Sequence, residues 1–365
     1  MVGVKIQTNE LITKLLDDWY VEIRSRNIAM SKQLKKEIDS EISNITSDEN
    51  LLLHYALLNF RHQYLIDSLS IGKESFNKIE SFPNPTDKVL TYYYHFFKAI
   101  HATITGDYIL AQREYGIAEN ELQNINDPIE HAEFYYKLST FSCHSQQYVL
   151  AIRQASMAQI IFSKYDGYNL NIGYCKNLSG LACIHLKEYE LAEEYLLAAR
   201  DIFKKQNDSH AISYVQHNLG LMYANQNLSE LAIKHISEIT TRTPNNYKAL
   251  FIEAREHFKM KNKEKANLLI DKALIICNSL KQEEFYHRLM ILKALNNNIP
   301  AKELEEIVNH GVDYFEKEKL YENIHIYYEF LAIKYYQEEN NLEASKYFFK
   351  SSQARKNTFD KGALK

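Results

Sequence analysis

The chain has 365 residues, of which 45% are hydrophobic and 25% are charged, with a formal net charge of −4 at pH 7. This balance is typical of a folded globular protein, and without a basic stripe it argues against sequence-independent binding to nucleic-acid phosphates. The cysteines form no C-x-x-C pair, no apolar run approaches the roughly 20 residues that cross a bilayer, and the N-terminus lacks a signal-peptide pattern. We therefore expect a cytoplasmic protein that contacts neither nucleic acid nor membrane directly.

Residues 1–70 are predicted to form a three-helix bundle, because apolar residues recur at helical spacing in three segments. Breaks fall near Arg26 and at residues 43–46, and Ser47 is the candidate N-cap of the third helix. A segment with Gly72, Pro83 and Pro85 follows, and we place a linker at 71–87. The three apolar stripes are Ile12, Leu15, Leu16, Trp19 and Ile23; Leu34, Ile38 and Ile42; and Leu51, Tyr55, Leu58, Leu65 and Leu69.

Residues 88–365 carry a repeated phrase, in the segments GDYILAQREYGIAENEL, QQYVLAIRQASMAQIIF, KEYELAEEYLLAARDIF and QNLSELAIKHISEI. Each places an alanine after a turn and a leucine, and by subtraction these alanines stand 40, 41 and 40 residues apart. A small residue stands twelve positions upstream of each alanine, which lets one helix lie close against its partner. The alanines are Ala111, Ala151, Ala192 and Ala232, and the small residues are Ala99, Ser139, Gly180 and Gly220.

This fixed-period self-similarity predicts stacked helical hairpins, and the spacing resembles the tetratricopeptide repeat. Ala266 begins another unit, Ala332, Ala344 and Phe348 mark one near the end, and the stretch between is degenerate. We expect six or seven hairpins between about residues 88 and 356, the alternative being a generic helical domain. The predicted fold is therefore all-α, with an N-terminal three-helix bundle followed by a tetratricopeptide-repeat superhelix.

The segments DDWYVEIRSRNI, SDENLLLHYALLNFRH, TYYYHFFKAI and HAEFYYKLS, in this order, resemble the Rap family of response regulator aspartate phosphatases and related regulators of Gram-positive bacteria. The likeness covers essentially the whole chain, and Trp19-Tyr20 and Phe60-Arg61-His62 carry it. It implies that bundle and repeats bind a response regulator, to remove its aspartyl phosphate or to block its DNA-binding domain, while some members act on other partners. It also implies quorum-sensing control of sporulation or competence, through an imported oligopeptide of about five residues that binds the repeat groove and compacts the receptor into an inactive shape.

The resemblance points to one catalytic position. Phosphatase members use a glutamine eleven residues before the Phe of the F-R-H motif to orient water, and counting back from Phe60 reaches Glu49. Glutamine offers a donor and an acceptor, whereas an ionised glutamate offers acceptors only and adds a charge that repels the phosphoryl group. A carboxylate can still orient water, so the activity stays open. The alternative role of Glu49 is an acidic residue in the first turn of a helix, beside Asp48.

The resemblance also points to two peptide-binding positions. Family receptors commonly hold the peptide backbone with an asparagine in the motif N-[IL]-G, which is Asn218-Leu219-Gly220 here. They often read a basic peptide residue with an aspartate thirty-three residues earlier, where this chain has His185. Asn218 keeps an amide that pairs with a peptide N–H and C=O, but His185 removes the fixed negative charge. The alternatives are a packing asparagine and an ordinary partly buried histidine.

Other motifs are set aside. The chain has no phosphate-binding glycine loop, no dinucleotide motif and no nucleophile elbow. His54 and His62 stand eight residues apart and His95 and His101 six, and neither spacing suits a metal. We therefore expect no metal and no cofactor.

The favoured function is a Rap-like regulator that inhibits a response regulator by dephosphorylation, a hydrolase activity, or by sequestration, under the control of a short oligopeptide. Two alternatives stay open. The chain is either a peptide-controlled adaptor for another target, such as a repressor, or a plain tetratricopeptide scaffold without a small ligand.

Overall fold

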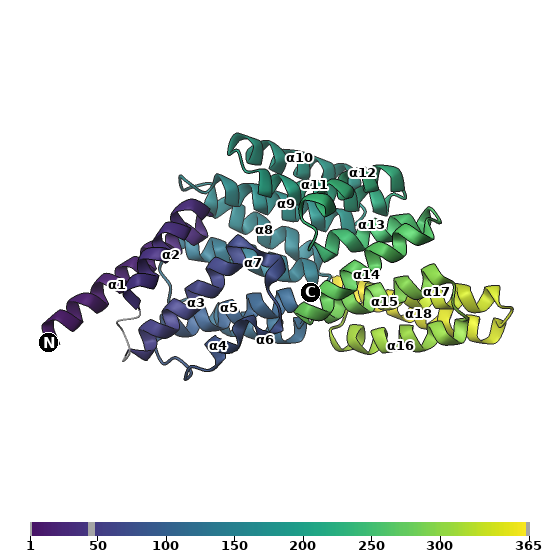
Figure 1. Ribbon diagram of the computed structural model, residues 1–365, viewed down its shortest axis with the longest axis horizontal. Coiled ribbons are helices and arrows are strands. Elements are labelled where there is room, and N and C mark those ends of the chain that lie inside the picture. The colour runs from purple at the N-terminus through teal and green to yellow at the C-terminus, as the bar shows by residue number, and fades with distance from the viewer. Residues whose placement is uncertain (1, 43–47, 363–365) are drawn as a thin grey trace.

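The computed structural model describes residues 2–42 and 48–362 of the chain. Every regular element in these two ranges is helical, with eighteen α-helices and two short 3₁₀ helices (Figure 1). This confirms the all-α prediction. All four cysteines are free and buried. In the same ranges, no helix combines the length and the apolar character needed to cross a membrane.

The first three helices are α1 (Val2–Arg24), α2 (Ile28–Ile42) and α3 (Glu49–Ile66). Trp19 Nε1 donates to Ser31 Oγ at 3.1 Å, and that oxygen lies 2.8 Å from His62 Nδ1, so one buried chain of contacts joins all three helices. The predicted N-cap of the third helix, Ser47, lies outside the described residues. Asp48 caps α3 by accepting a hydrogen bond from the Leu51 N–H at 3.1 Å.

The helix α3 also ends earlier than predicted, at Ile66, and Leu69 falls in the 3₁₀ helix η1 (Ser68–Ser70). Next come η2 (Lys73–Phe76) and α4 (Asn77–Glu80), where Phe76 is buried. A Cβ at Gly72 would lie 2.9 Å from the Leu280 carbonyl oxygen, so glycine permits the close approach of this segment to the repeats. The first part of the segment 71–87 is therefore packed rather than loose, and the division at 1–70, 71–87 and 88–365 stays a proposal.

Fourteen further helices pair into seven consecutive hairpins, the upper limit of the prediction, and the degenerate stretch forms the sixth hairpin (Figure 1). They are α5 (Lys88–Thr105), α6 (Tyr108–Leu122), α7 (Pro128–His144), α8 (Tyr148–Phe162), α9 (Asn169–His185), α10 (Tyr189–Lys205), α11 (Ser209–Asn225), α12 (Ser229–Arg242), α13 (Tyr247–Lys259), α14 (Lys263–Leu280), α15 (Glu283–Asn297), α16 (Ala301–Lys317), α17 (Tyr321–Gln337) and α18 (Asn341–Gly362).

The repeated phrase does what its spacing predicts. Ala111, Ala151, Ala192 and Ala232 are all buried. A Cβ at Gly180 would lie 2.8 Å from Leu196 Cγ, so the small residue of the first helix makes room for the large residue of the second. The last unit differs, because Phe348 is 44% exposed where the phrase predicts a buried ring. The helix α18 is the last helix of the described residues, and the neighbouring Tyr347 is the buried ring instead.

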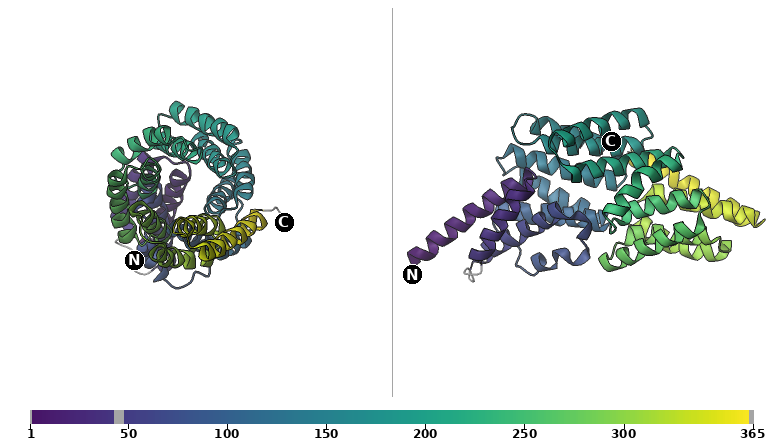
Figure 2. Two further views of the ribbon diagram at one scale, coloured as in Figure 1. Left: turned by 90° about the vertical axis from the view of Figure 1, so that its right-hand side faces the viewer. Right: turned by 45° about the horizontal axis from the view of Figure 1, so that its top comes forward.

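The hairpins curve into a ring when viewed along the long axis (Figure 2). Long-range contacts join the first hairpin to the end of the sixth hairpin. The N–H groups of Tyr108 and Ile109 donate to Glu318 Oε2 at 2.7 and 3.1 Å, so a carboxylate from α16–α17 caps the start of α6. Tyr314 Oη donates to the Gly106 carbonyl at 2.7 Å in the same region. The superhelix is thus a closed turn with a defined inner face.

Candidate functional site

Three neighbouring cavities, with volumes of about 90, 140 and 240 Å³, lie along the inner face of the ring. Tyr64, Ser68 and Lys137 line both the first and the second, and His144 and Lys248 line both the second and the third, so the cavities form a continuous row. Almost all lining residues of the largest cavity come from the first helix of a hairpin, in α7, α9, α11, α13, α15 and α17. The repeat register therefore builds this cavity from segments far apart in sequence.

His185, predicted from the family motif, lines this largest cavity, which we call the inner-face cavity. Its ring stacks on Tyr148, with centroids 4.5 Å apart and planes 6° apart. Glu322 Oε2 accepts a bond from Tyr148 Oη at 2.6 Å and lies 4.0 Å from His185 Nδ1. Burial lowers the pKa of His185, although Glu322 opposes the shift, so the imidazole is neutral at neutral pH.

Asn218, the second predicted position, lies on α11 next to His217, and His217 lines the inner-face cavity. Asn218 itself is 5% exposed and does not line that cavity. Its amide Nδ2 donates to Asn177 Oδ1 at 3.0 Å, across to α9. The structure thus brings Asn218 and His185 onto neighbouring helices, but a direct role of Asn218 in binding a ligand stays a prediction.

Glu49, the predicted catalytic position, is the first residue of α3 and is exposed to solvent. It lines none of the three cavities. The carboxylate stands in the first helical turn, where it complements the helix dipole, and this agrees with the alternative role. Its exposure also leaves it accessible to a protein partner, so catalysis at Glu49 stays a prediction.

The inner-face cavity holds charged residues that sequence reasoning did not select. Arg288 Nη2 lies 2.5 Å from Glu284 Oε1, and Tyr108 Oη donates to Glu284 Oε2 at 2.6 Å. Arg255 Nε lies 3.0 Å from Glu256 Oε1. These charged residues lie on the first helices of hairpins, so the repeat pattern could have indicated that they line the inner face. The degenerate repeats do not show which face of each helix turns inward.

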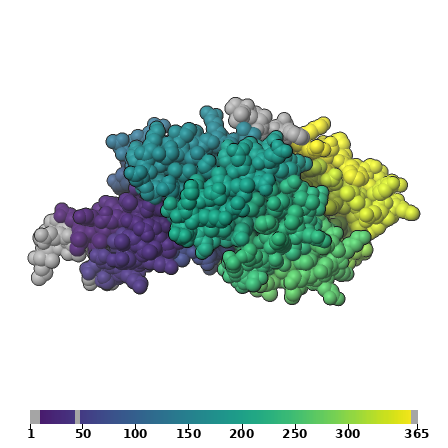
Figure 3. Space-filling model, turned by 90° about the horizontal axis from the view of Figure 1, so that it is seen from above, coloured from purple at the N-terminus to yellow at the C-terminus, as the bar shows by residue number. Residues whose placement is uncertain are grey.

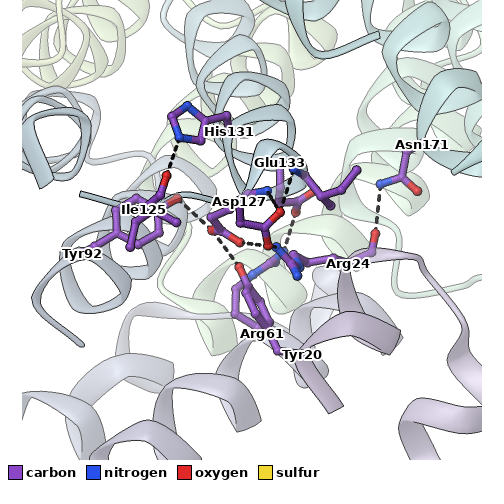
Figure 4. A network of polar contacts seen from close by, with 11 residues as sticks. Tyr20, Arg24, Arg61, Tyr92, Ile125, Asp127, His131, Glu133 and Asn171 are labelled. Carbon is purple, nitrogen blue, oxygen red and sulfur yellow. Dashed lines mark hydrogen bonds and ion pairs between the residues drawn. The ribbon is translucent and has the colours of Figure 1, made fainter. Parts of the chain in front are cut away.

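A second buried polar cluster joins the bundle to the repeats (Figure 4). Arg24 Nη1 lies 2.6 Å from Asp127 Oδ2 and 2.9 Å from Glu130 Oε2. Tyr20 and Tyr92 both donate to Glu130 Oε1, at 3.0 and 2.8 Å. Burial raises the pKa of Glu130, and the charge of Arg24 opposes the shift.

The same interface includes Arg61, whose Nη2 donates to Glu133 Oε1 at 2.6 Å, and Lys137, whose Nζ lies 3.7 Å from that oxygen. Burial by itself would raise the pKa of Glu133, but Lys137 and Arg61 hold it below its usual value. Glu130, Glu133 and Lys137 share one face of α7 by their spacing. Charged residues on one face of a helix were the sequence feature that could have predicted this interface. Through these ion pairs the bundle packs directly on the repeats (Figure 3).

Metal binding has no structural support in the ranges 2–42 and 48–362. No group of three or more His, Cys, Asp or Glu side chains there is arranged to hold an ion.

The fold and the site define a class: a helical-repeat protein with an N-terminal bundle and an internal cavity. The family model described as response regulator aspartate phosphatase H, N terminal, matches residues 6–67. The chain is 26% identical to response regulator aspartate phosphatase I of Bacillus subtilis (strain 168), over 97% of this chain and 93% of that protein. It is 25% identical to regulatory protein RapF of the same organism, over 94% of each chain.

Among solved structures, a Rap protein complexed with Competence and Sporulation Factor superposes with a TM-score of 0.79, over 97% of this chain and 99% of that one, at 21% identity. This likeness concerns the fold. The end-to-end sequence matches and the match to residues 6–67 both point to one group of proteins, and the chain is similar to Rap proteins along its length.

Proposed function

We propose that this protein regulates a response regulator, which it binds and inhibits, and that a short oligopeptide bound in the inner-face cavity controls it. The main observation behind this proposal is the cavity of about 240 Å³, which is lined mostly by the first helices of six consecutive hairpins. Relatives named response regulator aspartate phosphatases support the first part, and the Rap structure complexed with Competence and Sporulation Factor supports the second. We place the protein in the cytoplasm, where four free cysteines stay reduced.

The cavity has the mixed character that a peptide requires. Leu221, Phe251 and Phe285 offer apolar surface to side chains, whereas Glu322 and Asn323 offer polar groups. We propose that His185 and Asn218 contact the peptide. Glu322 supplies a carboxylate beside His185, so a basic peptide residue would find its partner on α17 rather than on α9.

For the effect on the response regulator, we favour sequestration over dephosphorylation. The reason is chemical: the carboxylate of Glu49 repels an aspartyl phosphate and donates no hydrogen bond at neutral pH. A carboxylate can position water, so the two mechanisms are separated by experiment.

The test incubates the full-length protein with response regulators of its own genome, phosphorylated with radiolabelled acetyl phosphate. Sequestration predicts complex formation in gel filtration with the label lost at the regulator's own rate. Loss faster than that rate would establish phosphatase activity, and Glu49→Gln should then increase it. Failure to bind any response regulator, with capture of a repressor instead, would overturn this part of the proposal.

A further inference from the structure

Among the side chains that the structure describes, one lysine of the inner-face cavity has no carboxylate partner within the protein. Its lining includes three basic residues, Lys248, Arg255 and Arg288, and two acidic ones, Glu284 and Glu322. Each arginine already has a carboxylate neighbour, in Glu256 and Glu284. Among residues 10–42 and 48–358, whose side chains the structure describes, no carboxylate lies within 4.0 Å of Lys248 Nζ and no acceptor lies within hydrogen-bond distance of that ammonium. Within these residues, Lys248 is therefore the cavity lysine or arginine without a carboxylate partner.

The surroundings of Lys248 are apolar and only partly open. The side chain is about two-thirds or more buried, between the cavity and the rings of Phe285 and Tyr247, whose centroids lie 5.8 and 5.9 Å from Nζ. Burial lowers the pKa of Lys248, and the attraction of Glu284 only partly offsets this. An ammonium in such a place loses hydration and gains only these two cation–π contacts, with no carboxylate within ion-pair distance in the described side chains, which is unfavourable unless a ligand brings an anion.

The position of Lys248 fits that role. It lines both the second cavity and the inner-face cavity, so a ligand that lies along the row passes its ammonium. The two arginines that line the cavity already lie beside carboxylates, so within the described side chains the Lys248 ammonium is left by itself. A single ammonium suits one carboxylate, because a phosphate usually takes several donors or a bidentate arginine.

We propose that Lys248 binds a carboxylate of the controlling peptide, either the C-terminal carboxylate or an Asp or Glu side chain. This inference rests on the proposed peptide control of the protein and specifies the chemistry of the peptide. The peptide then carries a negative group as an anchor, held by a charge-assisted hydrogen bond inside the ring.

The experiment uses two pools of synthetic pentapeptides, randomised at every position, one with free C-termini and one with amidated C-termini. Full-length protein is immobilised, incubated with each pool and washed, and retained peptides are sequenced by mass spectrometry. Lys248→Met is compared with the wild type, Lys248→Arg tests whether charge alone suffices, and Lys272→Met is the matched control on the exposed face of the neighbouring helix α14. Circular dichroism establishes that each variant is folded.

In one outcome, the wild type retains more peptide from the free-acid pool than from the amidated pool. If this preference falls roughly tenfold in Lys248→Met but is kept in Lys248→Arg and Lys272→Met, the group that Lys248 binds is the C-terminal carboxylate. Enrichment of Asp or Glu in both pools, lost in Lys248→Met alone, assigns a side-chain carboxylate. If Lys248→Met retains the same acidic or free-acid peptides as the wild type, the inference is wrong and peptide control stands. If the wild type retains no peptide from either pool, peptide control fails and the inference falls with it.

Discussion

The bundle–repeat interface and the inner-face cavity both bury charged side chains, but they pair them differently. At the interface, Glu130 and Glu133 each lie within ion-pair distance of a cation from the bundle, Arg24 or Arg61. In the cavity, Lys248 has no such partner in the described residues, and Glu322 is bonded only to neutral or weakly basic groups.

The difference separates two uses of buried charge. Paired charges cost desolvation but define one arrangement of the parts, because removal of either partner leaves the other uncompensated. A desolvated charge without a partner is unfavourable, and a ligand of opposite charge would compensate it. The interface therefore orients the bundle, and the cavity is where we propose that a ligand binds.

The largest effect is expected at the interface. Glu133→Gln removes the carboxylate between Arg61 and Lys137, and we expect a loss of about 3–5 kcal/mol in the free energy of unfolding. The fluorescence of Trp19, the single tryptophan, which is buried in the bundle, reports urea unfolding. Glu119→Gln, on the exposed face of α6, is the control and should change stability by less than about 0.5 kcal/mol. Equal effects of the two changes would refute the structural role of the interface.

The second prediction concerns how the free energy of unfolding depends on pH, through His217 in the inner-face cavity. Burial lowers the pKa of His217 from 6.5 to about 4. Between these values the unfolded chain binds more protons than the folded one, so stability is complete above about pH 6.5 and falls as the pH drops toward 4, by at most about 3 kcal/mol for this residue. His217→Gln should flatten the dependence of the urea midpoint on pH in this window. An unchanged slope would contradict the assigned pKa.

A matched pair of tyrosines compares the two regions directly. Tyr20 donates to buried Glu130 at the interface, and Tyr148 donates to half-exposed Glu322 in the cavity. Removing a hydrogen bond to a buried charge costs about 1.5–3 kcal/mol, so Tyr20→Phe should destabilise the protein by about that much. Tyr148→Phe should cost less than about 1 kcal/mol, because water reaches its acceptor. Urea unfolding measures both, and a larger loss from Tyr148→Phe would reverse the comparison.

The smallest effect has the opposite sign. Lys248→Met removes an unpaired ammonium, and we expect the ligand-free protein to gain roughly 1 kcal/mol in the free energy of unfolding. Lys272→Met, on the surface, should leave it within about 0.5 kcal/mol. Destabilisation by Lys248→Met would mean that the ammonium already has a favourable partner in the protein.

The helices were predictable because their signals are local. The alanines of the repeated phrase and the small residues twelve positions upstream face each other within one hairpin, so their spacing alone specifies the packing. Local spacing did not predict two further details. Phe348 is exposed on α18, the last helix of the described residues, and Gly72 lies close to Leu280 at the end of α14.

The resemblance selected two residues in the region of the cavity. His185 lines the inner-face cavity and Asn218 lies beside it with its amide bonded to Asn177, and their contact with a peptide stays a prediction. Lys248, Arg288 and Glu322 escaped notice, because each lies in a different hairpin and no short pattern links them.

By itself, the sequence determined the helical class, the repeat period, the hairpin contacts and the resemblance carried by Trp19-Tyr20 and Phe60-Arg61-His62. The tertiary structure alone decided that Tyr20 and Arg61 reach α7, and that α7–α9 faces α15–α17 across one cavity. The physical reason is distance along the chain. Contacts within a hairpin follow from local spacing, but closure of the ring depends on small rotations summed over seven hairpins, which no single segment encodes.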